Sequence, residues 1–293
     1  MRGLTARIKT DINLSKIYFS KGSWYEKMID VQNQKDNRNI KIQRTGIAGV
    51  YLPLKISDGG EIQDVLAKIK FTVSLNEKIR GTHMSRLSEI LTDYVNLPLK
   101  ISDTEKILLD ALQKLETDFS AIEIAFKFFV KKTAPTSGRE SLLDIDCKFI
   151  GELKKNSRVK FSLALAVPFT SLCPCSKEIS DFGAHNQRSI CRVQLNFFDA
   201  DKLDEIKISE IIKMIEAQGS SEIFPILKRE DEKFVTEAAY KNPKFVEDIL
   251  RDVVLSLRKV KNLSSFEVEC ENFESIHNHS AFAGHAEKIF TDF

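Results

Sequence analysis

The sequence predicts an α+β protein in which antiparallel strand pairs alternate with pairs of helices. Three observations support this class. In several segments apolar residues repeat with period two, as expected of half-buried strands. In the stretches between them apolar residues recur every three or four positions, which is the spacing of one helix face. The elements follow the order ββααββ, and this order occurs twice, with a seam near residue 155.

The first forty-five residues precede this pattern. Residues 1–45 are polar and weakly patterned, and we expect them to form an N-terminal arm. A first ββααββ module is predicted over residues 46–155, and a second over residues 156–293. Strand pairs joined by short loops imply antiparallel sheets, and in each module a helix pair should pack on one face of the sheet.

In the first module, strands are expected at 49–57 and 67–75 and again around 122–130 and 143–149. Between these two strand pairs lie two helices, the second behind a capping box formed by Ser102 and Glu105. The helix faces consist of Leu87, Ile90, Leu91 and Tyr94, and of Leu108, Ala111, Leu112 and Leu115.

In the second module, strands are expected around 159–167 and 191–197, and a final strand around 266–270. One helix carries Ile208, Ile211, Ile212 and Ile215. A further helix should begin at Asn242-Pro243, because Asn is a good N-cap and Pro suits the first helical position.

The composition is that of an ordinary globular protein, long enough for two domains or one large one. The net charge of +2, from 44 basic and 42 acidic residues, gives no reason to expect a nucleic-acid partner or a polybasic membrane anchor. No apolar run approaches the roughly 18 residues that span a bilayer, and the N-terminus lacks the apolar core of a signal peptide. We therefore expect a cytoplasmic protein without a membrane partner.

One segment, "SLCPCSKEISDFGAHNQRS" at 171–189, combines cysteine and histidine. Cys173 follows a predicted strand and His185 precedes the next one, so the two could converge on zinc or another divalent transition metal. A buried loop cysteine and an unrelated surface histidine explain the pair equally well. Five cysteines, an odd number in a reducing compartment, argue against a disulfide framework. A Cys173–Cys175 bond would close a strained ring.

Two further segments concentrate polar residues. Residues 227–248 are rich in carboxylates, each of which a solvated surface would explain, and Glu247 suits a helix N-terminus. Residues 271–285 follow the last predicted strand, and three of the five histidines fall within the nine residues 277–285. A polar turn accounts for the asparagines there but does not account for the histidines.

Together these three segments closely resemble the prokaryote-specific GTP cyclohydrolases of type IB. The resemblance covers the chain from about residue 165, and "GTHMSR" at 81–86 extends it more weakly into the first half. It implies the tunnelling fold, in which two ββααββ modules per subunit join their sheets edge to edge into barrels. It also implies a homotetramer with active sites at subunit interfaces, which agrees with open sheet edges that need partners.

The resemblance also implies the site residues. Cys173, His185 and Glu232 correspond to the ligands of one divalent metal per active site, which would be zinc, manganese or iron(II), and three ligands leave a fourth position for water. In addition to Cys173, the catalytic residues would be Glu247 and His277. The substrate-binding residues would be Glu274 for the purine and Arg188 and Lys228 for the triphosphate, with Lys177 and Arg229 as further candidates.

The implied activity is that of a hydrolase acting on cyclic amidine C–N bonds. It converts GTP and water to 7,8-dihydroneopterin triphosphate and formate, for tetrahydrofolate and for deazapurine-modified (queuosine) tRNA nucleosides. Imidazole titrates near the operating pH and suits proton transfer to N7 by His277. A carboxylate such as Glu274 accepts both N1–H and the 2-amino group of guanine.

Two alternatives stay open. An archaeal relative of the family releases a cyclic phosphate of dihydroneopterin instead. A non-catalytic metal- or nucleotide-binding module would need a fourth protein ligand, for which Cys175 is a candidate.

Overall fold

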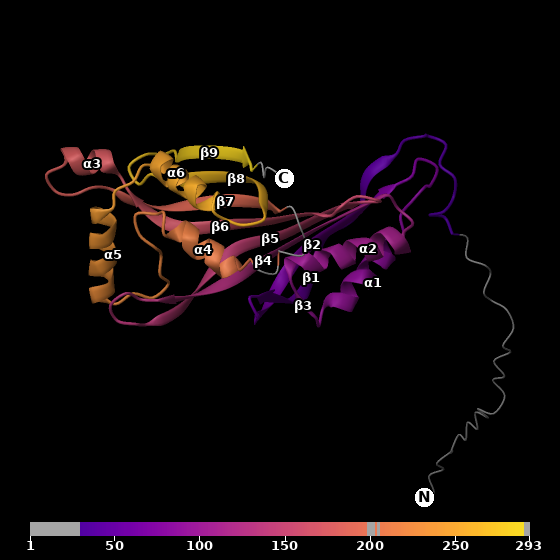
Figure 1. The fold of residues 1–293 in the computed structure, drawn as a ribbon, viewed down its shortest axis with the longest axis horizontal. Coiled ribbons are helices and arrows are strands. Elements are labelled where there is room, and N and C mark those ends of the chain that lie inside the picture. The colour runs from indigo at the N-terminus through magenta and orange to yellow at the C-terminus, as the bar shows by residue number, and fades with distance from the viewer. Residues whose placement is uncertain (1–29, 198–202, 204–205, 290–293) are drawn as a thin grey trace, which may run out of the picture.

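The computed structural model describes residues 30–197, 203 and 206–289. Within these ranges nine strands form one sheet in the order β3-β1-β2-β4-β5-β6-β7-β8-β9, and all neighbours are antiparallel except β1 and β3 (Figure 1). The strands are β1 Ile42–Asp58, β2 Glu61–Leu75, β3 Pro98–Leu99, β4 Phe119–Thr133, β5 Glu140–Lys154, β6 Lys160–Leu172, β7 Asn186–Phe197, β8 Leu263–Asn272 and β9 Ala281–Lys288. The helices are α1 Met84–Tyr94, the 3₁₀ turn η2 Ile101–Asp103, α2 Thr104–Lys114, α3 Pro174–Ile179, α4 Ile208–Glu216, α5 Arg229–Lys241 and α6 Val246–Leu257.

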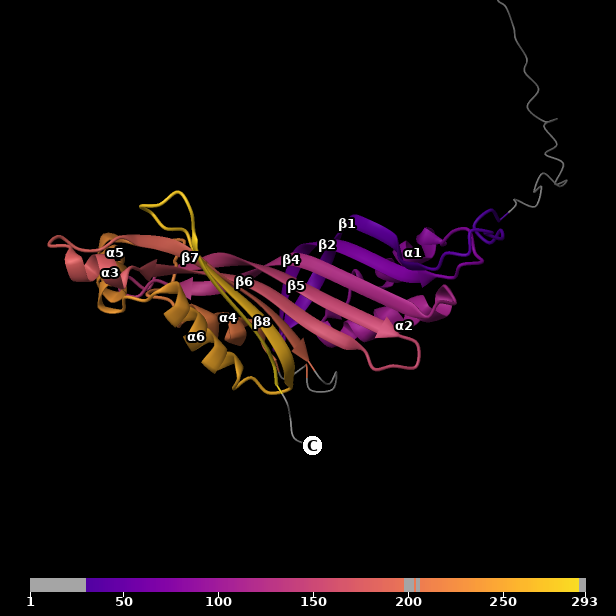
Figure 2. The same cartoon turned by 90° about the horizontal axis from the view of Figure 1, so that it is seen from above.

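A single row of apolar residues crosses six strands and makes the sheet continuous. Each residue lies opposite the next in the antiparallel register, and all are buried. The row consists of Ile69, Ile124, Phe149, Leu163, Leu195 and Phe266. Helices α1 and α2 pack on the first strands, and α4 and α6 on the later ones (Figures 1 and 2). The alternation that predicts the strands therefore also forms the core.

The order of elements is more complex than two plain ββααββ units, because β3 lies between α1 and α2, and α5 between α4 and α6. The mixed α+β class is confirmed. Five elements were not predicted, namely β3, η2, α3, α5 and β9. Helix α5 buries only Asp231 and Ala239, so its sequence has no apolar stripe. Strand β9 lies at the edge of the sheet and is largely exposed, so its alternation is weak.

The N-terminal boundary of the sheet differs from the prediction. Strand β1 begins at Ile42, inside the predicted arm 1–45, and Ile42 lies opposite Leu75 in β2. Residues 32–36 of the arm exchange backbone hydrogen bonds with residues 78–81. Residues 1–29 lie outside the described part of the chain. The arm was predicted from polarity alone, but a strand whose side chains are exposed is polar as well, and the first three residues of β1 are exposed.

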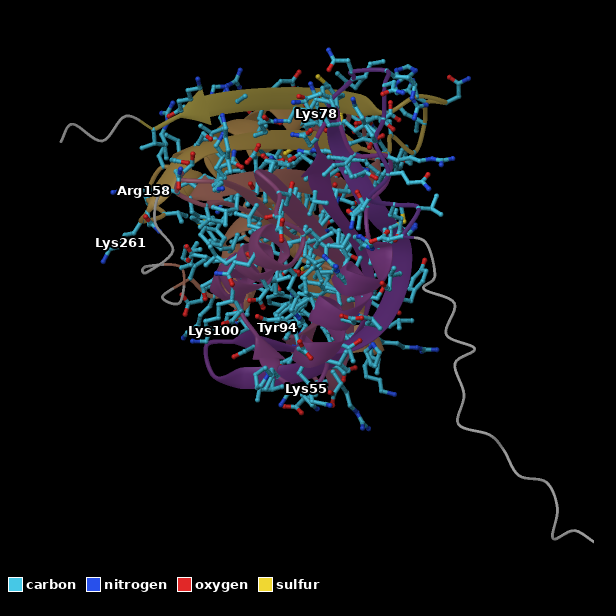
Figure 3. The ribbon with its side chains drawn as sticks, turned by 90° about the vertical axis from the view of Figure 1, so that its right-hand side faces the viewer. Lys55, Lys78, Tyr94, Lys100, Arg158 and Lys261 are labelled. Atoms are coloured by element: carbon cyan, nitrogen blue, oxygen red, sulfur yellow. The ribbon has the colours of Figure 1, made fainter. Side chains whose placement is uncertain are left out.

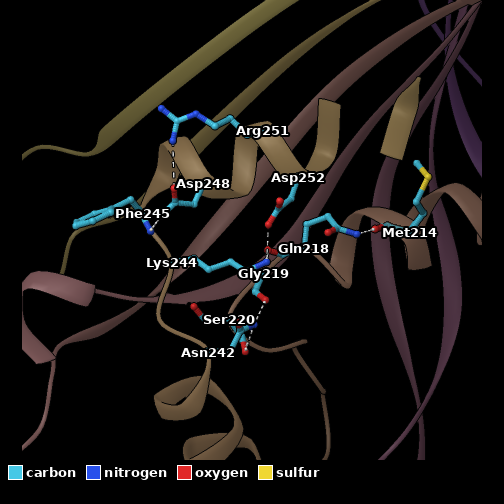
Figure 4. A network of polar contacts seen from close by, with 10 residues as sticks. All are labelled: Met214, Gln218, Gly219, Ser220, Asn242, Lys244, Phe245, Asp248, Arg251 and Asp252. Atoms are coloured by element: carbon cyan, nitrogen blue, oxygen red, sulfur yellow. Dashed lines mark hydrogen bonds and ion pairs between the residues drawn. The ribbon is translucent and has the colours of Figure 1, made fainter. Parts of the chain in front are cut away.

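Two predicted helix caps are wrong. Helix α2 begins at Thr104 rather than after a Ser102 cap, and Asp103 closes the turn by accepting the backbone N–H of Lys100 at 2.9 Å. Asn242 ends α5 instead of starting α6, and its side-chain amide donates to the carbonyl of Gly219 at 3.0 Å (Figure 4). At the start of α6, Asp248 accepts the backbone N–H of Phe245 at 3.1 Å.

The surface shows how the charges of the chain are balanced. Lys55 and Lys261 extend away from the ribbon (Figure 3), and Lys55 lies 2.7 Å from Asp64. Tyr94 donates its hydroxyl to Asp110 at 3.1 Å, and burial together with that carboxylate raises the pKa of Tyr94 to about 12.

No helix in the described ranges is both long and apolar enough to span a bilayer.

A buried ion pair joins the two halves of the chain. Lys132 in β4 and Glu216 at the end of α4 have side chains only 6% and 2% exposed, and the Nζ–Oε1 distance is 3.0 Å. Lys132 also contacts Glu222, and its Nζ lies 4.9 Å from the centre of the Phe224 ring. Burial raises the pKa of Glu216 in spite of the lysine. A single ammonium group thus holds a first-half strand against a second-half helix.

Lys132→Met should destabilise the protein by about 3–5 kcal/mol, because Glu216 would remain buried without a counter-charge. The matched control is Lys131→Met, whose partner Glu140 is exposed and whose loss should cost about 0–1 kcal/mol. Urea unfolding at one fixed protein concentration measures both. Equal free energies of unfolding for the two variants would contradict the importance of the buried pair.

Candidate active site

Cys173 and His185 meet where β6 and β7 end. Strand β6 runs to Leu172, five residues beyond the expected end, and β7 begins at Asn186 directly opposite. The connection, residues 173–185, is therefore shorter than the predicted loop and contains α3. The backbone N–H of Cys173 donates to the carbonyl of His185 at 3.1 Å. Antiparallel pairing alone brings the two residues together, as the sequence indicated.

The side chains of this pair differ in how they are held. The Cys173 Sγ accepts the backbone N–H of Ser176 at 3.4 Å. Nδ1 of the His185 ring lies 2.8 Å from Oε1 of Gln187 and 3.6 Å from Oε2 of Glu274. His185 Nε2 makes no hydrogen bond to any residue in the described ranges. The second ring nitrogen therefore remains available to a ligand.

Glu274 reaches the pair from the neighbouring strand. Strand β8 ends at Asn272, which lies opposite Ser189 of β7, and the N–H of Phe273 donates to the carbonyl of Arg188 at 3.0 Å. The side chains of His185 and Glu274 are 12% and 13% exposed. Three of the predicted site residues thus come together at the ends of β6, β7 and β8.

The other predicted residues have exposed side chains. His277 stacks on His279 with ring centres 5.0 Å apart and planes 20° apart. Glu247 lies in the first turn of α6, and Arg188 is exposed on β7. Lys228 immediately precedes α5 and donates its backbone N–H to Asp231.

Lys177, a further candidate for the triphosphate, is tied to α5. Its Nζ donates to the carbonyl of Tyr240 at 2.6 Å and lies 4.4 Å from the centre of that ring. The lysine therefore joins α3 to the C-terminal end of α5.

Asp231 fixes the position of α5, which carries Glu232. Its carboxylate is fully buried and accepts the backbone N–H groups of Thr136 and Ser137, both at 2.8 Å, together with the Ser137 hydroxyl and the Lys228 N–H. Burial disfavours the charge, but these hydrogen bonds outweigh it and hold the pKa of Asp231 below its usual range. The start of α5 is thereby anchored to the β4–β5 hairpin.

Glu232 itself does not join Cys173 and His185 in the single chain. Among the described residues no three His, Cys, Asp or Glu side chains lie close enough together to hold a metal ion. Glu232 is exposed and makes no ion pair within the described ranges. Two other carboxylates in this part of the sequence are engaged, because Glu222 contacts Lys132 and Glu237 lies between Lys233 and Lys241.

The donor set is partly that of a transition-metal site. A thiol and an imidazole with an available Nε2 suit zinc, iron(II) or manganese. Of these ions zinc has the strongest preference for a sulfur ligand and manganese the weakest. Cys173 and His185 therefore fit two of three ligand positions, and among the described residues of one chain no carboxylate completes a three-ligand group with them.

Sequence reasoning missed the residues that support His185. Ser171, Gln187 and Ser189 are buried although they are polar. The alternation along β6 and β7 assigns these three positions to the covered face, where apolar residues are the rule. A polar residue at a position that the pattern assigns to the core was the available signal.

The fold defines the structural class of the protein. Uricase from Arthrobacter globiformis superposes with a TM-score of 0.52 at 4% identity, over 84% of this chain and 93% of that one. The likeness places the nine-stranded sheet of the described residues among the uricase-like tunnelling folds.

The sequence comparisons give the family. The family model described as "Type I GTP cyclohydrolase folE2" matches residues 28–283. GTP cyclohydrolase FolE2 of Azoarcus sp. (strain BH72) is 44% identical over 255 residues, which are 87% of this chain and 93% of the relative. The FolE2 enzyme of Nitrosomonas eutropha is 46% identical over 257 residues, with the same coverage. The chain belongs to the type I GTP cyclohydrolase FolE2 family, as the resemblance of its motifs indicated.

Cys173→Ser keeps an acceptor for the Ser176 N–H but removes the thiolate. We expect its Zn²⁺ affinity to fall more than about 100-fold, because losing outer partners of a ligand already costs about 10–100-fold. Cys175→Ser is the matched control, since Cys175 is exposed. Chelator competition measures both. An equal loss in the two variants would point instead to a two-thiolate site.

Proposed function

We propose that this chain is a GTP cyclohydrolase that opens the imidazole ring of GTP at C8 and releases that carbon as formate. Membership of the FolE2 family indicates that the chain has GTP cyclohydrolase activity, which belongs to folate and pterin biosynthesis. The product in the proposal is 7,8-dihydroneopterin triphosphate. The observation that carries the proposal is the convergence of Cys173, His185 and Glu274 at three adjacent strand ends.

In the proposal Cys173, His185 and Glu232 hold one divalent metal, zinc, manganese or iron(II). Such an ion, when bound, supplies a water whose pKa is lowered to about 7. Glu232 is the preferred third ligand because its carboxylate is exposed and has no ion-pair partner among the described residues. Because Asp231 anchors α5 within one chain, the third ligand would be the Glu232 of a neighbouring subunit.

Glu274 would hold the base. Its two oxygens accept the N1–H and the 2-amino group of guanine, which adenine does not present in that arrangement. Because Glu274 lies beside His185, a guanine bound there lies next to the metal-binding pair.

The remaining residues would move protons and neutralise charge. His277, with an exposed ring, would protonate N7, and Glu247 would relay protons. Arg188 and Lys228 would bind the triphosphate, and Arg188 makes no ion pair within the described ranges.

We further propose two tunnelling-fold modules per subunit, 46–155 and 156–293, and a homotetramer with active sites at subunit interfaces. Both edges of the sheet, β3 and β9, have an unpaired side in the described chain. Ile179 and Phe182, which follow the Cys173 turn, are 84% and 100% exposed, as expected of residues that a second subunit covers. The face of the sheet opposite the helices, which we call the open face, has a hollow of about 650 Å³. Lys68, Lys127 and Arg192 are among the residues that line it, and in the proposed assembly this hollow would line the tunnel.

Anaerobic incubation with GTP across a series of Zn²⁺, Mn²⁺ and Fe²⁺ tests the activity. We expect one formate per GTP and a product that retains the triphosphate by mass, and a chelator should abolish both. A cyclic phosphate product would support the archaeal type of reaction instead. Absence of formate with every metal would favour a non-catalytic binding module.

Glu274→Gln should weaken GTP use and narrow the preference for GTP over inosine triphosphate, which lacks only the 2-amino group. A site built to pair with a donor rejects an analogue without it by about 10⁴-fold, because its buried acceptor is left unpaired. Glu271→Gln, three residues earlier on β8 and paired with Arg192, is the control. The ratio of kcat/KM values for the two nucleotides decides, and an unchanged ratio in Glu274→Gln would refute the assignment.

A further inference from the structure

A buried polar cluster lies beneath His185 where the sheet pattern calls for apolar residues. Ser171 on β6 lies directly opposite Gln187 on β7, and Ser189 follows on the same strand. Gln187 is 7% exposed and the two serines are almost fully buried. Gln187 Nε2 donates to Ser171 Oγ at 2.8 Å, and Ser189 Oγ donates to the same oxygen at 2.9 Å. Burying three polar side chains is costly unless they are paired, and here they are paired with one another.

The cluster leaves one atom of Gln187 directed at the histidine ring. Because Nε2 of Gln187 is bound to Ser171, its Oε1 faces His185 Nδ1 at 2.8 Å. The carboxylate of Glu274 approaches the same nitrogen at 3.6 Å. Two oxygen acceptors therefore face Nδ1, and a bare nitrogen lone pair would be repelled by both. If the Gln187 amide were flipped, its NH₂ group would face His185 Nδ1 and would need a bare lone pair there as its acceptor. That lone pair would then also face the Glu274 carboxylate. The proton thus belongs on Nδ1.

We propose that Gln187 is a positioning residue that fixes the Nδ1–H tautomer of His185 and so presents the Nε2 lone pair to the metal. The proposal rests on the metal-binding role given to His185 above. In a neutral imidazole one nitrogen donates and the other accepts, and the hydrogen bond of one nitrogen decides which one is free to bind a metal. Outer partners of this kind orient the ring and strengthen it as a ligand.

The cluster also explains why the orientation is rigid. Ser171 lies two residues before Cys173, and Gln187 lies two residues after His185, so their hydrogen bond crosses between the two strands that carry the ligands. Ser189 supplies a second bond to Ser171 Oγ and leaves the serine little freedom to rotate away. The same pair of strands thereby fixes both the spacing of the two ligands and the orientation of the imidazole.

The test compares Zn²⁺ affinity, without nucleotide, in the full-length wild type and three variants. Gln187→Met keeps the volume and removes the acceptor, and Gln187→Glu keeps an acceptor towards Nδ1. Gln194→Met makes the same chemical change on β7, outside the cluster, and is the matched control. We expect Gln187→Met to bind Zn²⁺ about 10–100-fold more weakly, with the other two variants close to wild type.

The outcomes separate this proposal from the one on which it rests. If the wild type binds Zn²⁺ and Gln187→Met binds it equally well, or if Gln187→Glu loses as much affinity as Gln187→Met, the positioning role is wrong. If the wild type itself binds no Zn²⁺ through His185, as judged with His185→Asn, the metal site fails first.

A second measurement needs no metal and observes the wild type itself. Nitrogen-15 spectra of metal-free, histidine-labelled wild type report which ring nitrogen carries the proton, with His185 assigned through His185→Asn. We expect a protonated Nδ1 and a bare Nε2. A protonated Nε2 in the neutral ring would overturn the proposal.

Discussion

The pairing of β6 with β7 continues to the last residue of β6 and the first residue of β7, and the candidate site depends on it. The pairing of Leu172 with Asn186 leaves Cys173 and His185 as the next residues outward, already joined through their backbones. The register also decides which side chains face the helices. A slip of one residue would turn Gln187 to the open face and leave the imidazole without its partner. Strand pairing therefore fixes the distance between the two ligands and also the support beneath one of them.

The helices that surround this site are held by buried polar groups from the first half of the chain. Asp58, at the turn between β1 and β2, accepts the N–H of Ile208 at 2.6 Å and so begins α4, and Lys132 holds the end of that helix. The β4–β5 hairpin holds the start of α5 through Asp231. Apolar packing binds helices to a sheet without strict direction, whereas these hydrogen bonds fix where each helix begins. The position of Glu232 is thus determined by residues almost one hundred positions earlier.

Sequence reasoning succeeded where one face of an element is apolar. The alternation of Ile122, Ile124 and Phe126 predicts β4, and the structure places these residues in the core. It failed where burial is slight, as in α5 and β9, because propensity and pattern then carry little information. It also failed at Asn242, since local capping preference cannot reveal that Gly219, distant in sequence, offers a carbonyl.

The candidate site was predictable to a similar degree. Motifs locate Cys173 and His185, and antiparallel pairing suffices to bring them together. The approach of Glu274 depends on how β8 lies against β7, a non-local pairing that no short motif encodes. The place of Glu232 depends on the hairpin that binds Asp231, and the role of Gln187 became visible only as a buried polar side chain.

The continuous apolar row across the sheet has a consequence for how this chain can be divided. Every motif of the candidate site lies after residue 165, so the second half alone holds the chemical groups. Yet Phe149 of β5 lies against Leu163 of β6, and a cut between them would leave two long, hydrophobic, unprotected strand edges. A truncated gene that encodes only the motif-bearing half would therefore yield an aggregating polypeptide. A fusion or deletion in the middle of the chain would separate these paired strands, whereas one at either end would leave the β5–β6 pairing intact.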